Sequence, residues 1–315
     1  SSVPSSAGTS SRKVTVSLTK VSASSIPNNL RTAGESITEL PSPSSPSEEP
    51  LPRTPCRSIS YDQVFNATIE TICTELPQAI AVGTAAGEED IVTAATAGRA
   101  SVRVDLGNWA GAVADAQAVP DGFIYTAPYF NLEQAQFNRI FWAGAGQPYL
   151  SVSVWNTQWE EYYATTGDPR VPWQWTSLET GDTFDAFEDG PPADDLDATK
   201  GDAAVAIVED SIPNGSVPFF QQTKHASENA SITLSSKWEM NLIEAEAALR
   251  DGQVGPALDL MNVRRADLEI DELTAADLEE AWTLLKRERG IELWLEARRM
   301  NDIRRWQEDN TPGAL

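Results

Sequence analysis

Positive charge is scarce in this 315-residue sequence. It has 23 Lys and Arg against 47 Asp and Glu, which gives a formal net charge of −24 at pH 7. Proteins that hold nucleic acid neutralise its phosphates with clustered Lys and Arg, so this balance argues against a nucleic-acid partner. The excess of acid also favours neutral or cationic ligands over anionic ones.

Cysteine and histidine are also rare. Cys56 and Cys73 are the only cysteines, and neither belongs to a CxxC pair, so no zinc site is indicated and at most one disulfide is possible. The single histidine, His225, has no Gly-x-Ser-x-Gly motif to accompany it, and we interpret it as a surface loop residue rather than a triad member. Phosphate-binding glycine loops are absent, which excludes the common nucleotide enzymes.

Long apolar runs are missing as well. No stretch of about 18 apolar residues is present to span a bilayer, and neither a signal peptide nor a lipidated cysteine is recognisable. Residues 1–57 are rich in Ser and Pro, a composition that buries too little apolar surface to offset chain entropy. We expect a disordered Ser/Pro-rich segment or an altered N-terminus at 1–57, followed by a helical domain at 58–315.

Helical periodicity begins near Tyr61 and is interrupted at Pro77 and Gly83. Further helices are predicted at about 88–106 and 109–118, separated by a glycine turn. Four positions of this region match four others 145 residues later in spacing: Ala100, Val104, Gly107 and Ala112 correspond to Ala245, Leu249, Gly252 and Ala257. Small residues on both sides of a glycine turn predict tetratricopeptide-type hairpins at about 61–120 and 238–266, although any Ala-rich helical pair has similar spacing.

Between the hairpins, residues 121–235 show no sustained periodicity and contain many turn formers. A stretch this long without regular structure inside a compact protein is usually functional, or it contains elements that the pattern does not reveal. The predicted fold class is therefore mainly α, with a long irregular insertion. Aromatic side chains in the insertion offer flat faces that stack on sugars, and core packing is the alternative for each of them. We predict that glycan-binding residues lie among Trp155, Trp159, Tyr163, Trp173 and Trp175.

A single long helix is predicted from Asp277 to about Gln307, with Thr274 as its N-cap. Acidic residues repeat every four positions along it, and several acid–base pairs have the spacing of intrahelical ion pairs, such as Glu296 with Arg299 and Arg298 with Asp302. Glycosidases need two carboxylates across a cleft rather than several along one helix. We interpret these residues as a structural helix clamp, comprising Glu288, Arg289, Glu292, Glu296, Arg299, Asp302, Arg305 and Trp306.

An acidic stretch at 189–202 resembles a calcium loop only weakly. It departs from the EF-hand pattern, because Lys200 stands where the turn glycine belongs and Ala206 where the bidentate Glu would be. A solvated loop is the better interpretation, and we expect no cofactor and no metal.

Three motifs in the C-terminal half resemble the SusD/RagB family of outer-membrane glycan-binding lipoproteins. They are Leu242-Ile-Glu-Ala-Glu-Ala247 before the Gly252 turn, Ala257-Leu-Asp-Leu-Met-Asn262-Val-Arg264 after it, and the charged segment from Glu288 to Trp306, where Gly290 and Ala297 depart from the usual Arg and Gly. With weaker similarity at 106–125 and 168–171, the resemblance covers about residues 61–308. It implies a tetratricopeptide-like scaffold and loops that carry the glycan site.

The resemblance also implies a cell-surface lipoprotein of the outer membrane that works with a SusC-like TonB-dependent transporter. We therefore predict non-catalytic binding of an oligosaccharide or polysaccharide and its delivery to that transporter. Two alternatives stay open. One is a glycoside hydrolase that uses acids of the insertion, such as Glu160, Asp185 or Asp189. The other is a tetratricopeptide scaffold that binds a peptide.

Overall fold

The computed structural model describes residues 63–145, 152–177, 180–192 and 219–315, without the side chains of 63–73 and 143–145. The predicted disordered segment at 1–57 lies outside these residues, as do Cys56, the side chain of Cys73 and most of the acidic stretch at 189–202. No helix of the described part is long and apolar enough to cross a membrane.

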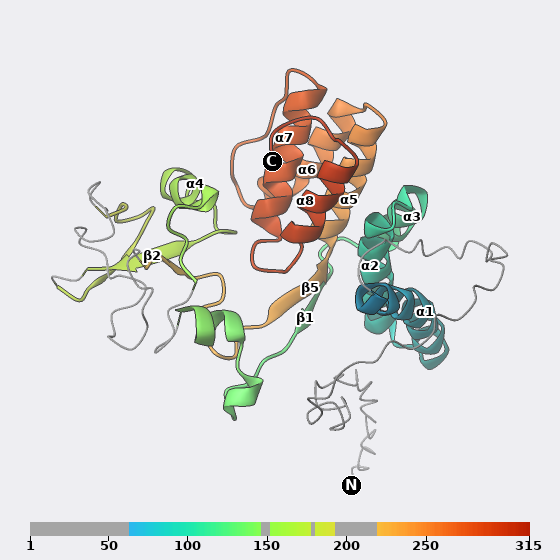
Figure 1. Ribbon diagram of the computed structural model, residues 1–315, viewed down its shortest axis with the longest axis horizontal. Coiled ribbons are helices and arrows are strands. Elements are labelled where there is room, and N and C mark those ends of the chain that lie inside the picture. The colour runs from blue at the N-terminus through green and yellow to red at the C-terminus, as the bar shows by residue number, and fades with distance from the viewer. Residues whose placement is uncertain (1–62, 146–151, 178–179, 193–218) are drawn as a thin grey trace, which may run out of the picture. The chain divides into compact units, whose positions relative to one another are not determined.

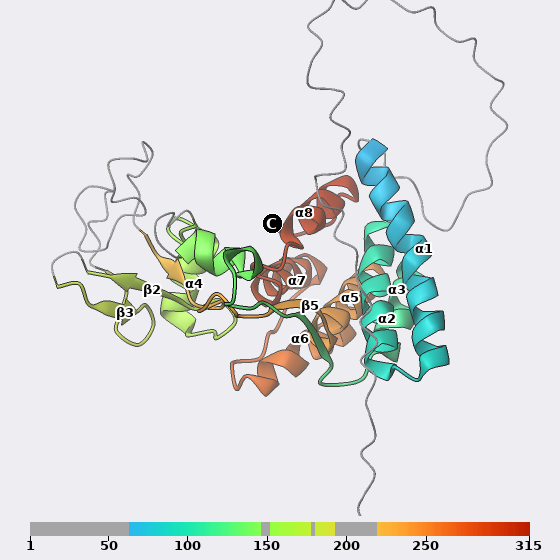
Figure 2. The ribbon, with the colours of Figure 1, turned by 90° about the horizontal axis from the view of Figure 1, so that it is seen from below.

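Three helices open the described chain: α1 (Gln63–Ala86), α2 (Glu89–Asp105) and α3 (Trp109–Ala118) (Figure 1 and Figure 2). The expected interruption of the first helix is wrong, because α1 continues through Pro77 and Gly83. Pro77 has no backbone N–H and so removes one hydrogen bond from α1, and the packing of α1 along α2 offsets this loss of stability. Gly83 serves a close approach of the two helices, since a Cβ there would lie 3.0 Å from Val92 Cγ2.

The second hairpin consists of α5 (Lys237–Arg250) and α6 (Val254–Asp267). Its turn residue Gly252 has a φ of 73°, and Gly107 in the first hairpin has a φ of 69°, a region that favours glycine. The four matched alanines, Ala100, Ala112, Ala245 and Ala257, are all fully buried. Both predicted hairpins are therefore confirmed, the matched glycines and alanines have the same conformation and burial in each, and the fold is mainly helical as predicted.

The predicted long final helix is two helices, α7 (Leu278–Glu292) and α8 (Arg299–Glu308). Between them Leu295 and Ala297 both have a φ of 61°. Lys224 explains the break, because its Nζ donates to the backbone oxygens of Glu292 and Trp294 and satisfies carbonyls that a continuing helix would use. The N-cap of α7 is Asp277, which accepts from the N–H of Glu280 at 2.9 Å, rather than Thr274.

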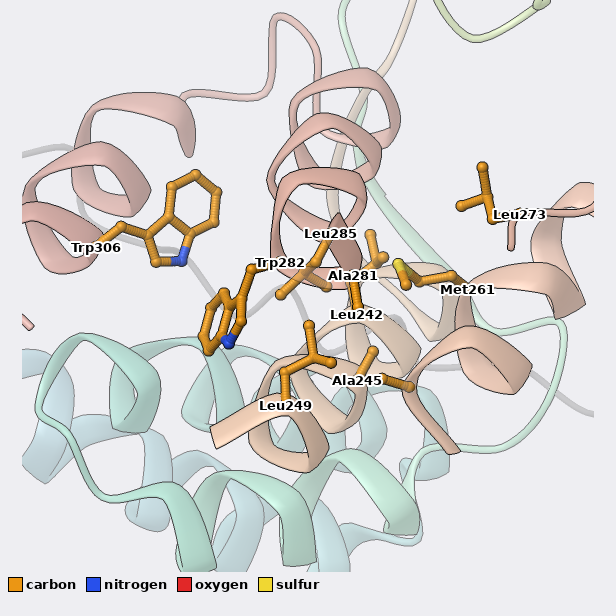
Figure 3. Packing of buried hydrophobic residues seen from close by; sticks show 10 residues of the cluster. Leu242, Ala245, Leu249, Met261, Leu273, Ala281, Trp282, Leu285 and Trp306 are labelled. Carbon is orange, nitrogen blue, oxygen red and sulfur yellow. The ribbon is translucent and has the colours of Figure 1, made fainter. Parts of the chain in front are cut away.

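The main hydrophobic core lies among α5, α6, α7 and α8 (Figure 3). Figure 3 shows the Trp282 ring beside Leu249 of α5 and below Trp306 of α8, with Met261 of α6 on the other side of Leu285. A second cluster joins the first hairpin to α5 through residues of α2, α3 and α5, among them Ala97, Val104, Ala116, Met240 and Ile243. Helix α5 of the second hairpin is therefore the helix on which the first hairpin packs.

The described parts of the insertion form short ordered elements. Strand β1 (Ile124–Ala127) pairs antiparallel with β5 (Ile232–Ser236), and β2 (Trp173–Thr176) lies between β3 (Thr183–Asp185) and β4 (Gln221–Gln222). The other elements are a 3₁₀ turn at Gln134–Gln136, a π-helical turn at Ile140–Ala145 and α4 (Gln158–Thr166). A third hydrophobic cluster joins α4 and β2 to Ile291 of α7 and so fixes the insertion to the helices.

Gly290 provides a direct test of this contact. A Cβ at this position would lie 2.9 Å from Cη2 and Cζ2 of Trp159, whose ring is buried. We expect Gly290→Ala to lower the free energy of unfolding by about 1–3 kcal/mol through overpacking, although alanine is the better helix former. Urea unfolding followed by circular dichroism measures the change.

Gly255 of α6 is the matched control, because a Cβ there would have no neighbour within 4 Å. Gly255→Ala should raise the free energy of unfolding by up to about 1 kcal/mol. A stabilising effect of both substitutions would show that Trp159 does not press on α7.

Candidate functional site

Three of the five predicted glycan-binding aromatics are core residues. Trp173 has no exposed surface, and Trp159 and Tyr163 are 8% and 7% exposed. The Trp173 ring stacks on Phe220 with centroids 4.5 Å apart, and its Nε1 donates to the backbone oxygen of Glu160. The prediction that these three side chains contact a glycan is therefore wrong, because their faces are covered by the cluster that joins the insertion to α7.

Trp155 and Trp175 keep part of their surface in solvent. Trp175 stacks on Phe184 at 4.8 Å and donates from Nε1 to the backbone oxygen of Gly190 at 3.0 Å, so its ring is held in one orientation. Phe187 is 48% exposed. We use the name aromatic surface for the four partly exposed aromatic residues Trp155, Trp175, Phe184 and Phe187. Its two tryptophans are the members of the predicted set that can still contact a ligand.

The three acids proposed for the hydrolase alternative make structural hydrogen bonds. Glu160 accepts from the backbone N–H of Asn156 at the start of α4, and burial raises its pKa. Asp185 accepts from the Tyr163 hydroxyl at 2.8 Å and also from backbone N–H groups of the turn that follows it. Asp189 accepts from the N–H of Asp185. Each carboxylate therefore fixes a helix start or a turn.

The glutamates of α7 bind arginines from other elements. Glu288 is 1% exposed and accepts from Arg170 at 2.8 Å and from Arg265 at 2.9 Å. Glu292 accepts from Arg170 and Arg264, both at 3.3 Å. Burial alone lowers the pKa of Arg170, but the carboxylates of Asp168, Glu288 and Glu292 outweigh it and raise that pKa, so the guanidinium stays charged.

The other half of the predicted clamp joins α7, α8 and α5. Arg289 donates to Asp302 at 2.9 Å, while Arg305 donates to Asp302 at 2.9 Å and to Glu246 at 2.8 Å. The Trp306 Nε1 also donates to Glu246, which has no exposed surface. Five of the eight predicted clamp residues, Glu288, Arg289, Asp302, Arg305 and Trp306, thus lie in buried contacts between helices.

Two predicted intrahelical pairs are wrong because the helix breaks between α7 and α8. Glu296 binds Lys224 at 2.9 Å rather than Arg299, and Arg298 binds Glu239 at 3.0 Å rather than Asp302. Arg299 donates instead to the backbone oxygen of Lys286. Helical spacing identified the charged residues but could not identify partners that come from elsewhere in the chain.

His225 is buried rather than a surface loop residue, with 3% exposure. Its backbone N–H is held by the side chain of Gln222, which closes the turn after β4. Burial, together with the charge of Lys224, lowers the pKa of His225 to about 4, so its imidazole is neutral at pH 7. Among the described residues no three His, Cys, Asp or Glu side chains converge as a metal site would require.

A cavity of about 260 Å³ lies where the β1–β5 pair meets the second hairpin and the end of α7. Its acidic wall residues, Glu292 and Glu296, come from neighbouring turns of one chain segment, while Arg170, Lys224 and Arg264 supply positive charge. Burial raises the pKa of Glu296, and the nearby Lys224 opposes that shift. Among the described residues the wall contains no acid from another segment, so Glu292 and Glu296 do not flank a substrate as a glycosidase pair does.

Two helical hairpins that pack together through α5, with buried ion pairs that fix an irregular insertion to them, define a helical-scaffold protein. Residues 221–312 match the model of the SusD family, in agreement with the resemblance of the sequence motifs. The match contains the second hairpin, the cavity glutamates and the whole predicted clamp.

A solved SusD-like protein from Bacteroides fragilis has 15% sequence identity to this chain and a TM-score of 0.44. The alignment covers 69% of this chain and 54% of that protein, so the chain spans about half the length of that relative. No curated protein matches the sequence.

Proposed function

We propose that this protein binds an oligosaccharide or polysaccharide at the cell surface without cleaving it and delivers it to a SusC-like TonB-dependent outer-membrane transporter. The SusD family match over residues 221–312 carries this proposal, since it supports glycan binding at the level of the family. The aromatic surface adds support, because partly exposed indole rings stack on the C–H faces of sugars.

The hydrogen bonds and ion pairs of the acidic side chains agree with a non-catalytic role. Glu160, Asp185 and Asp189 accept structural hydrogen bonds, and Glu292 and Glu296 are paired with cations. A general acid and a nucleophile or base would have to stand on opposite sides of a glycosidic bond. None of these observations favours the hydrolase over a binding protein.

Replacing Trp155 or Trp175 by Ala should weaken glycan binding. Loss of a stacking indole is expected to cost about 1 kcal/mol or more, which is at least a fivefold loss of affinity. Affinity electrophoresis against a panel of polysaccharides measures the effect, and chromatography of the same mixtures detects products. Met300→Ala on α8, at a side chain that is 62% exposed, controls for loss of an exposed apolar group.

Retardation without products supports the proposal, and weaker retardation of both Trp variants places the glycan on the aromatic surface. Turnover of any polysaccharide would favour the hydrolase. If no polysaccharide were retarded while peptides bound, the tetratricopeptide scaffold would be the better assignment.

Delivery to a transporter is tested separately. SusD family proteins are in general cell-surface lipoproteins of the outer membrane associated with SusC-type transporters. A tagged full-length protein should therefore co-purify with a TonB-dependent transporter from detergent-extracted outer membranes of its source. Recovery of the tagged protein free of any transporter would contradict this part of the proposal.

A further inference from the structure

The polar groups in the wall of the cavity beside α7 differ in whether the protein itself satisfies their hydrogen bonds. Lys224 is satisfied, because its Nζ makes three hydrogen bonds, to the backbone oxygens of Glu292 and Trp294 and to Glu296 Oε1. Arg170 likewise donates from all three of its nitrogens to carboxylates and is 4% exposed. These two cations shape the wall and neutralise its acids.

Four charged or aromatic wall residues keep hydrogen-bonding capacity, and so does the hydroxyl of the wall residue Thr233, which makes no hydrogen bond within the described residues. Glu292 bonds through Oε2 and Glu296 through Oε1, and the second oxygen of each accepts no bond from a described residue. Arg264 donates from Nε to Glu292 and from Nη1 to Asp267, which leaves Nη2 without an acceptor in the described chain. The indole N–H of Trp238 makes no hydrogen bond within the described residues either.

The same wall has apolar faces and a fixed shape. Arg264 lies over the Trp238 ring at 4.6 Å, so the guanidinium and the indole hold each other in place. Ile124, Leu268 and Pro169 add apolar surface. Leu295 and Ala297, both with positive φ, flank Glu296, and Lys224 holds the Glu296 carboxylate through Oε1.

We infer that this cavity is a binding subsite for one neutral sugar ring, distinct from the aromatic surface. This inference rests on the proposed glycan-binding function. Hydroxyl groups both donate and accept, so one sugar can donate to the carboxylate oxygens and accept from Arg264 Nη2 and the Trp238 N–H. The volume, about 260 Å³, is just below the range of drug-sized ligand pockets, which suits a single ring rather than a chain.

A charged ligand suits the cavity less well. An anion would meet two carboxylates, and the only cation with a donor left over in this part of the wall, Arg264, already shares its charge with Glu292 and Asp267. A cation would meet Arg170, Lys224 and Arg264. Neutral hydroxyls avoid both penalties because the wall charges already compensate one another.

The test is titration of the full chain with methyl glycosides of neutral hexoses, followed by saturation-transfer NMR. Glucuronic acid serves as the anionic comparison. Trp238→Phe keeps the ring under Arg264 but removes the N–H, and Thr233→Val removes the hydroxyl of a half-buried wall residue on β5. Loss of one neutral hydrogen bond should lower the affinity for the bound hexoside by about three- to tenfold in each variant.

Thr126→Val is the matched control, because Thr126 is the cross-strand partner of Thr233 and does not line the cavity. It should leave hexoside affinity unchanged. Binding of no neutral hexoside, equal affinity in all three variants, or tighter binding of glucuronic acid would each overturn the inference. If polysaccharides are still retarded in any of these cases, only the subsite is wrong, whereas absence of all retardation removes the proposed function itself.

Discussion

Replacing Glu246 by Leu is expected to lower the free energy of unfolding by about 3–5 kcal/mol, the cost of breaking a buried ion pair by removing one partner. Glu246 is fully buried and accepts hydrogen bonds from Arg305, Arg250 and the Trp306 indole. The substitution leaves the Arg305 and Trp306 donors in the core with fewer acceptors. Urea unfolding followed by tryptophan fluorescence measures the change.

Asp309→Ala is the matched control, because Asp309 also binds Arg250, at 2.7 Å, but its side chain is 42% exposed. Exposed pairs contribute about 0–1 kcal/mol, so this variant should unfold almost like the parent protein. Equal losses in the two variants would show that burial does not set the strength of these contacts, and the description of Glu246 as the buried partner of the clamp residues Arg305 and Trp306 would be abandoned.

Arg170→Met should have an effect of similar size, about 3–5 kcal/mol at neutral pH. Arg170 connects the 168–171 loop to α7, and its loss leaves the buried carboxylates of Asp168 and Glu288 without their nearest cation. Arg264→Met removes a more exposed arginine from the same group, and we expect it to cost about 1 kcal/mol.

The pH dependence distinguishes an electrostatic effect of Arg170 from simple loss of packing. Burial tends to raise the pKa of Asp168, but bonds from Arg170 outweigh it and lower that pKa. A carboxylate with a lowered pKa stabilises the folded state above its unfolded pKa, and this contribution is lost as the pH falls through the folded pKa. The parent protein should therefore lose stability below about pH 4.

In Arg170→Met the pKa of Asp168 should rise, since burial is no longer opposed by the guanidinium. The orphaned carboxylate can then take up a proton in the folded state, so the difference between parent and variant should shrink as the pH falls towards 4. Chemical unfolding at pH 7, 5.5 and 4 measures this. A difference that stays constant with pH would mean that the packing of the Arg170 side chain, rather than its charge, carries the effect.

Much of the helical scaffold was predictable from local patterns. The matched positions around Gly107 and Gly252 identified both hairpins, because close approach of two helices demands small residues and the turn demands positive φ. The clamp residues of α7 and α8 were identifiable from helical spacing. Neither feature depends on which distant segment packs nearby.

The site was less predictable, because exposure is a property of the packed molecule. Aromatic residues in a segment without periodicity looked accessible, yet Trp173 is enclosed by α4, Phe220 and Ile291. The cavity was not predicted either, since its wall comes from six separate segments between Ile124 and Glu296. The Asp168-Pro-Arg170 segment and Glu246 were present in motifs of the family resemblance, which was the only signal for them in the sequence.

The sequence by itself determined the acidic character, the two glycine-turned hairpins and the charged residues of the final helices, because composition and helical periodicity are local properties. Only the tertiary structure decided that the last helix breaks at Glu292, which carboxylates are buried, and which tryptophans remain in solvent. Lys224 illustrates the reason: one ammonium group 68 residues away along the chain satisfies the carbonyl of Glu292, and no local pattern contains that contact.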